Sequence, residues 1–150
     1  MNTLAFFNNK GGVGKTTLVY HLTWMLAELG LSVVAADLDP QANLSSMFLD
    51  EDRLEAIWSE PGRPRTVSGS LGPLMEGTGD VAEPWIAGIS PGIGLVVGDL
   101  ALSTVEDEMS SQWPGCLDGK SRAFRVITAF WRLLAKAARK RDADISTVLP

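Results

Sequence analysis

A glycine-rich segment near the N-terminus constrains this chain more than any other feature. It reads Asn8-Asn9-Lys10-Gly11-Gly12-Val13-Gly14-Lys15-Thr16-Thr17. An apolar run, residues 4–7, precedes it, and an amphipathic segment, residues 18–29, follows it. This is the order of a phosphate-binding loop, because glycines let backbone N–H groups converge and a helix N-terminus adds positive potential there. The segment therefore predicts a nucleotide site in which Lys15 reaches the β/γ-phosphates and the Thr16 hydroxyl joins a Mg²⁺ shell.

Two carboxylates follow the next predicted strand, residues 32–36. Asp37 and Asp39 lie at i and i+2 and are followed by Pro40, which halts the strand. Ligands bind α/β sheets beyond the carboxyl ends of parallel strands, so this pair is placed for a role in the same site. A solvated strand end is the alternative interpretation, and we would favour it if the glycine loop were absent.

The remaining pattern predicts an α/β fold with a parallel sheet flanked by helices, in a single domain over residues 1–150. Further strands are expected at 85–89, 93–97 and 145–149, and helices at 15–29, 44–58, 71–76, 100–113 and 121–141. Residues 60–72 are expected to form a loop. Pro114-Gly115 is expected to end the predicted helix 100–113. Two apolar stripes are expected to face the core, one of Leu18, Leu22, Met25, Leu26 and Leu29 and one of Phe124, Ile127, Phe130, Trp131, Leu134 and Ala138.

Composition narrows the classes of function. The formal net charge is -5, which argues against a chain that binds nucleic acid as a whole, although the basic face of residues 121–141 leaves a local contact open. That face is more simply a solvated one. The single cysteine, Cys116, fits a reducing cytosol, and no window approaches the roughly 20 apolar residues of a membrane span. We therefore expect a cytoplasmic protein.

The glycine loop resembles the deviant Walker A motif of the ParA/MinD ATPases, although Asn9 stands where the common pattern has its first glycine. Residues 37–43 are similar to the Asp-x-Asp-Pro-Gln segment of the ParA branch, and Gly98-Asp99-Leu100-Ala101-Leu102-Ser103 resembles a further stretch of ParA-like partition proteins. The resemblance covers most of residues 1–144. It implies a P-loop NTPase fold, ATP and Mg²⁺ as ligands, and a role in plasmid or chromosome partition.

The resemblance also implies roles for individual residues. The nucleotide-contact set would be Lys10, Gly11, Gly12, Val13, Gly14, Lys15, Thr16 and Thr17. Lys10 matches the lysine that reaches across a nucleotide-sandwich homodimer to the partner's ATP, which makes hydrolysis depend on dimerisation. Asp39 matches the carboxylate that positions the attacking water, and Asp37 would sit near the Mg²⁺. A ParB-like activating protein and nonspecific DNA, bound through the full-length protein, are the implied partners.

One expected feature of such an ATPase is missing. The strand at 145–149 is followed by Pro150 and by no acidic residue, whereas this strand normally ends in an aspartate that holds the Mg²⁺ shell. The chain is therefore interpreted as the N-terminal part of such an ATPase, with a sheet incomplete at its C-terminus. We expect residues 1–150 alone to be marginally stable or self-associating and to hydrolyse ATP poorly.

Other members of the wider class remain as alternatives. A MinD-like, membrane-associated positioning ATPase would need a C-terminal amphipathic helix, and the Asp-Pro-Gln segment favours ParA. An iron–sulfur carrier would need cysteine pairs. A nucleotide-binding scaffold without turnover is the alternative that the missing strand-end aspartate supports.

Overall fold

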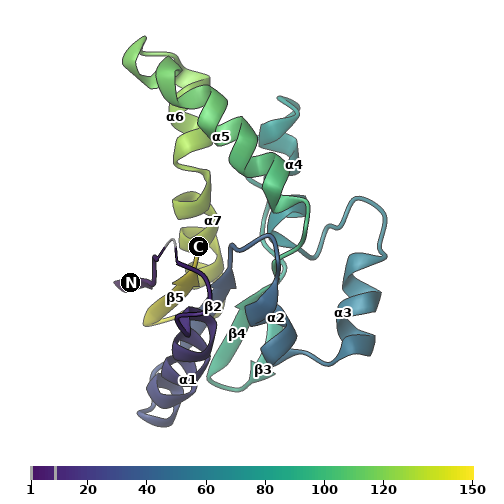
Figure 1. The fold of residues 1–150 in the computed structure, drawn as a ribbon, viewed down its shortest axis with the longest axis vertical. Helices are drawn as coiled ribbons and strands as arrows, with labels where there is room; N and C mark the ends of the chain where they lie inside the picture. The colour runs from purple at the N-terminus through teal and green to yellow at the C-terminus, as the bar shows by residue number, and fades with distance from the viewer. Residues whose placement is uncertain (1, 9) are drawn as a thin grey trace.

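A five-stranded sheet forms the centre of the chain in a computed structural model, which describes residues 2–8 and 10–150 (Figure 1). The strand order is β1-β5-β2-β4-β3, and only β3 runs antiparallel, against β4. The strands are β1 (Asn2–Ala5), β2 (Val33–Asp37), β3 (Ala87–Ser90), β4 (Ile93–Val96) and β5 (Ile145–Leu149). The predicted α/β fold with a parallel sheet flanked by helices is confirmed.

Seven helices of the described residues cover both faces of this sheet. They are α1 (Lys15–Glu28), α2 (Asn43–Phe48), α3 (Glu51–Trp58), α4 (Val67–Met75), α5 (Leu102–Leu117), α6 (Ser121–Ile127) and α7 (Ala129–Arg141). One face packs against α4 to α7 through a large apolar cluster that includes Val34, Ala36 and Leu133. The other face packs against α1, α2 and α3, through Ala35, Leu44 and Leu54 among others. Side chains alternate between the faces along β2, which is why this strand is apolar throughout.

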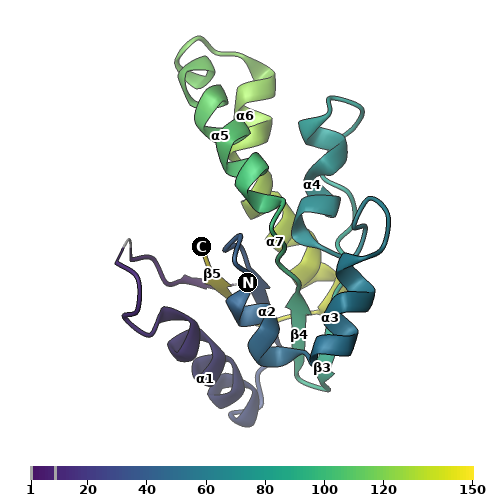
Figure 2. The ribbon, with the colours of Figure 1, turned by 45° about the vertical axis from the view of Figure 1, so that its right-hand side comes forward.

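The helical hairpin of α5 and α6 extends away from the sheet, as Figures 1 and 2 show. The sequence predicts that Pro114 ends the helix that corresponds to α5, but α5 continues to Leu117 with Pro114 inside it. The carbonyl that Pro114 leaves without a donor belongs to Ser110, an exposed residue, so water can satisfy it. Gly115 is buried, and a Cβ there would lie 3.1 Å from that of Ala123, so the glycine lets α5 and α6 approach closely.

Other element boundaries differ from the prediction for local reasons. The predicted helix 44–58 is two helices, because the Asp50 carboxylate accepts a hydrogen bond from the Arg53 N–H and starts α3 anew. The predicted helix 121–141 is also divided, at Thr128, whose hydroxyl donates to the Phe124 carbonyl at 2.7 Å. Helix α4 begins at Val67, inside the predicted loop, where Thr66 caps it. Strand β1 ends two residues earlier than expected.

Both predicted apolar stripes are partly wrong. Leu18, Met25 and Leu29 are exposed, and the buried residues of α1 are Val19 and Thr23. Thr23 can be buried because its hydroxyl bonds the Val19 carbonyl and lies 2.7 Å from the Thr147 hydroxyl.

The second stripe shifts in the same way. Phe124 and Trp131 are exposed, whereas Leu134 and Ala138 are buried as predicted. The positions that pack closest are small or branched ones, namely Ala123, Val126, Ala129, Leu133 and Ala137. No helix in residues 2–8 and 10–150 is long and apolar enough to cross a membrane.

Candidate nucleotide site

The carboxyl ends of the four parallel strands bring the sequence motifs to one edge of the sheet. The glycine loop follows β1, Asp37 ends β2, and Gly98-Asp99 follow β4. Strand β5 lies between β1 and β2, so the loop and Asp37 are two strands apart in the sheet. Contact between Val19 of α1 and Leu44 of α2 holds the two segments together on one face. The sequence-predicted residues are thus brought to a common edge.

The glycine loop has the geometry of an open anion cradle. Gly12 and Gly14 have φ of 71° and 83°, a conformation that other residues adopt at a cost. Helix α1 starts directly after Gly14 without a side-chain cap. The N–H groups of Gly12, Gly14, Lys15 and Thr16 donate no hydrogen bond to other described residues, so they remain available to a ligand. Four open donors at a helix N-terminus suit a phosphate chain.

Two lysines flank this cradle. The Lys15 ammonium donates to the Asn8 carbonyl at 2.6 Å, and the Lys10 N–H donates to the Asn8 side chain at 2.9 Å. The Lys10 side chain is exposed and makes no ion pair with a described residue. Asn9 lies outside the described residues. No hydrogen bond or ion pair within the described chain joins either lysine to Asp37 or Asp39.

Asp37 is completely buried and closes the loop that follows β2. One oxygen, Oδ2, accepts hydrogen bonds from the Ser45 N–H at 2.7 Å and from the Ser45 hydroxyl at 2.8 Å. The other, Oδ1, accepts from the Asp39 N–H at 3.3 Å. Burial raises the pKa of Asp37 to about 6, although the two bonds from Ser45 partly offset that effect.

Ser45 is in turn held by the neighbouring strand. Its hydroxyl oxygen accepts the Gly98 N–H at 3.0 Å, and the Gly98 carbonyl accepts the Trp58 indole N–H at 3.0 Å. A Cβ on Gly98 would lie 2.8 Å from the Asp37 carbonyl oxygen, so only glycine fits there. A continuous hydrogen-bond chain therefore runs from Trp58 of α3 through Gly98 and Ser45 to Asp37. Below, it is called the Trp58–Asp37 relay.

Asp39 lies at the more open part of this edge. It is half-buried, and its Oδ1 accepts the Gln41 N–H at 2.9 Å, which fixes the turn that ends at Ala42. On α5, partial burial and then the charge of Asp39 raise the pKa of Glu106. Asp39 Oδ2 accepts no hydrogen bond from a described residue, at the ligand edge of the sheet.

Asp99, by contrast, is tied down by the protein. It is 2% exposed and lies 3.3 Å from the Arg63 guanidinium. Its other oxygen accepts the Ser68 hydroxyl at 2.6 Å, and the Ala101 N–H donates to Oδ1 at 2.8 Å. Asp99 therefore joins β4 to α4 and α5.

Sequence reasoning missed Ser45 and Trp58. The only signal for Ser45 was a hydroxyl residue eight positions after Asp37, and helix-forming segments carry many such residues. Trp58 stood at the end of a weakly helical segment, where an aromatic residue indicates packing. The hydrogen bonds of Ser45 and Trp58 to Gly98 form because β2 pairs with β4. The sequence around Ser45 and Trp58 does not indicate this pairing.

The basic face of α6 and α7 is less solvated than predicted. Most of its cations donate to residues 74–91, which run alongside these helices. Lys136 bonds the Val81 carbonyl, and Lys140 bonds the Pro84 carbonyl. The others are Arg122 on Leu74 and Met75, Arg125 on Gly79, Arg132 on Asp80 and Arg141 on Pro91. These charges mainly hold a long connection in place.

Comparison with known proteins agrees with this geometry. A family model described as an AAA domain (AAA_31) matches residues 1–116. The virulence plasmid ParA family protein pGP5-D of Chlamydia trachomatis is 57% identical over 47 residues, which are 31% of this chain and 18% of that protein. The segments matched in the first four curated relatives cover 12% to 18% of their lengths.

Solved structures match nearly the whole chain. The protein DIP2308 of Corynebacterium diphtheriae superposes with a TM-score of 0.88 at 33% identity, over 99% of this chain and 52% of that one. Cobyrinic acid a,c-diamide synthase of Mycobacterium smegmatis, with bound ADP and magnesium, gives 0.66 at 27% identity, over 99% of this chain and 50% of that one. The chain thus spans about half the length of these structures. By its motif, its fold and its family match, this chain belongs to the ParA/MinD family of P-loop ATPases.

Proposed function

We propose that the chain is the N-terminal portion of a ParA-like partition ATPase that binds ATP and Mg²⁺ and hydrolyses ATP in a nucleotide-sandwich dimer. The observation that carries the proposal is the open cradle before α1, which holds four N–H groups without partners among the described residues and is followed by α1, whose first residue is Lys15. The relative from a virulence plasmid and the length of the solved neighbours support it.

Within that cradle the roles divide by chemistry. Lys15 holds the β/γ-phosphates of its own subunit, and Thr17 contacts the α-phosphate side. Gly11, Gly12, Val13 and Gly14 shape the loop. The hydroxyls of Thr16 and Thr17 make no hydrogen bond to described residues, so they are available to Mg²⁺ and phosphate.

The magnesium ion would be held chiefly by phosphate oxygens. No group of three or more His, Cys, Asp or Glu residues in the described chain is arranged to hold a metal. This suits Mg²⁺, which usually takes one or two protein ligands and keeps several waters. Thr16 would bind it directly and Asp37 through water. When bound, the ion neutralises charge that develops on the phosphates.

Hydrolysis would need two further groups. Asp39, with an oxygen free of the turn it stabilises, orients the attacking water. Lys10 lies on the exposed side of the loop, where its ammonium can cross to the nucleotide of a second copy. A cation supplied in trans stabilises the transferring phosphoryl group, so turnover follows dimerisation. A cytoplasmic location, a ParB-like activator and nonspecific DNA complete the proposal.

Two substitutions test it. Lys15→Ala should weaken ATP binding by roughly 100-fold or more, because a charge-assisted contact to the phosphates is lost. Lys10→Ala should leave binding close to wild type and abolish ATP-dependent dimerisation. Isothermal titration calorimetry measures the first effect, and sedimentation velocity with and without ATP measures the second.

Lys120→Ala provides the matched control, because Lys120 is an exposed lysine whose one ion pair with a described residue is to Asp118. It should behave as wild type in both measurements. Unchanged ATP affinity in Lys15→Ala would refute a nucleotide site at this loop. Unchanged dimerisation in Lys10→Ala would refute the trans role of Lys10 while leaving the nucleotide site intact.

A further inference from the structure

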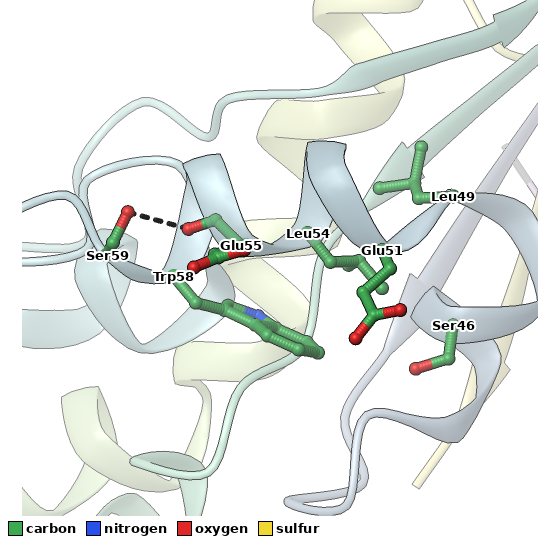
Figure 3. Close-up of a pocket in the computed structure, with 7 residues that line it drawn as sticks. All are labelled: Ser46, Leu49, Glu51, Leu54, Glu55, Trp58 and Ser59. Atoms are coloured by element: carbon green, nitrogen blue, oxygen red, sulfur yellow. Dashed lines mark hydrogen bonds between the residues drawn. The ribbon is translucent and has the colours of Figure 1, made fainter.

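We propose that a groove over α2 and α3 is the docking site for a positively charged segment of a partner protein. The groove, shown in Figure 3, has a volume of about 750 Å³. It is lined by Ser46, Leu49, Glu51, Leu54, Glu55, Trp58 and Ser59. No residue of the glycine loop is among the lining residues.

The lining has an apolar floor. Leu49 and Leu54 are buried against the sheet, and the half-buried Trp58 ring presents its remaining surface to the groove. A cavity of this size takes several side-chain atoms rather than a single ion. The floor therefore suits the aliphatic stem of a long side chain together with a neighbouring apolar residue.

The rim carries charge that the chain leaves unpaired. Glu51, Glu55 and Trp58 follow one another at i, i+4 and i+7, so they share one face of α3. Neither glutamate makes an ion pair or a side-chain hydrogen bond with a described residue. Other carboxylates of the chain do find cations, as in the pairs Glu60–Arg65, Glu83–Lys136 and Glu108–Arg122.

These features together select the chemistry of the occupant. Two like charges four residues apart on a helix repel each other, and a cation between them relieves the repulsion. An arginine or lysine can place its stem on the Trp58 ring and its charge between the two carboxylates. An acidic or purely apolar segment would leave both glutamates without a partner.

The groove is also connected to the nucleotide site. The Trp58 indole N–H begins the Trp58–Asp37 relay, which passes through the Gly98 carbonyl and N–H and then through the Ser45 hydroxyl. A segment that packs on the Trp58 ring will change the geometry of these bonds. An effect of docking on ATP hydrolysis rests on the proposed function, whereas docking itself does not.

The test uses the full 150-residue chain without nucleotide. The probe is a short acetylated and amidated peptide of leucine and alanine that carries two arginines four positions apart. A comparison peptide has glutamine in place of arginine. In ¹⁵N-resolved NMR titrations, we expect saturable shifts of the Trp58 indole N–H and of the Gly98 and Ser45 amides, with about fivefold tighter binding of the arginine peptide.

Two double variants with the same change of net charge separate the groove from general electrostatics. Glu51→Gln with Glu55→Gln should abolish the preference for arginine. Glu28→Gln with Asp52→Asn, which removes two exposed carboxylates outside the groove, should retain it. Equal affinity of the two peptides for the wild-type chain, or equal loss of the preference in both double variants, would overturn the docking site.

Trp58→Phe tests the connection separately. The ring surface remains, so the arginine peptide should still bind. The indole donor is gone, so the Gly98 and Ser45 amides should no longer shift. If these amides shift as strongly as in the wild-type chain, the relay does not transmit docking. A nucleotide site that fails in the Lys15→Ala experiment would leave these peptide measurements unaffected.

Discussion

Two buried aspartates at the ligand edge of the sheet are stabilised in different ways. Asp99 has the Arg63 guanidinium at 3.3 Å, so its charge is directly compensated. Asp37 has only hydrogen bonds, from Ser45 and from the Asp39 N–H, and no cation among the described residues. Burial therefore dominates and raises the pKa of Asp37 to about 6. The buried charge costs folding free energy at neutral pH.

This difference predicts a pH dependence. Because the pKa of Asp37 is higher in the folded chain than in the unfolded one, folding takes up a proton between about pH 4 and pH 6, and stability falls as the pH rises through this range. The fall should be about 3 kcal/mol. Asp37→Asn should remove it, since the amide oxygen still accepts both bonds from Ser45. Urea unfolding at pH 4 and pH 7 measures the difference.

Asp52→Asn, on an exposed position of α3, is the control and should keep the wild-type pH dependence. If Asp37→Asn loses as much stability between pH 4 and 7 as the wild-type chain, burial of the Asp37 charge is not the cause.

How far the sequence could predict this site depends on how local each residue's role is. Lys15 and Gly14 could be assigned because their neighbours in the chain, a strand before and a helix after, define the cradle. Ser45 and Trp58 could not, because their partners lie 53 and 40 positions away, on Gly98. The pairing of β2 with β4 creates these contacts, and periodicity gives no register between strands.

At the scale of elements, helices α6 and α7 and residues 77–84 form a unit held by charge. Asp80 receives guanidinium groups from Arg132 and Arg125, and these lower its pKa. The sequence predicted the basic face of these helices correctly but not what it contacts, since the long connection has no pattern of its own. The same limitation explains the misplaced apolar stripes. Exposed Trp131 and buried Ala137 follow from which helices approach closely, and hydrophobicity alone ranks them in the opposite order.

Asp80→Asn tests this unit. The substitution removes the negative charge that pairs with Arg125 and Arg132. Residues 77–84 should therefore separate from α6 and α7 more often. Amide hydrogen exchange of Ala82, whose N–H donates to the Ser70 carbonyl at 2.8 Å, should accelerate by about fivefold. Asp118→Asn breaks a more exposed pair with Lys120, on another part of the chain, and should leave Ala82 unchanged. Unchanged exchange in Asp80→Asn would show that backbone bonds alone hold the connection.

At the scale of the whole molecule, the sheet has two edge strands, β1 and β3. The sheet was expected to be incomplete at its C-terminal strand, residues 145–149, but β5 lies inside the sheet and pairs with both β1 and β2. Within the described residues β1 pairs only with β5 and β3 only with β4, and β1 is the more exposed of the two edges. All four of its residues are exposed, and the exposed Phe7 follows. An exposed edge with free N–H and carbonyl groups is a template for another strand.

The edge predicts how the 150-residue chain associates. If copies pair through β1, Leu4→Lys should shift the chain toward monomer, because a lysine on an edge strand disfavours the approach of a second sheet. Leu4 is 38% exposed, so the substitution buries no charge. Leu117→Lys is the control: Leu117 is 89% exposed but lies on the α5–α6 hairpin, which has no free backbone ladder. Sedimentation velocity over a range of concentrations measures both. Dissociation by Leu117→Lys but not by Leu4→Lys would assign the contact to the apolar hairpin surface, where packing and not strand addition drives association.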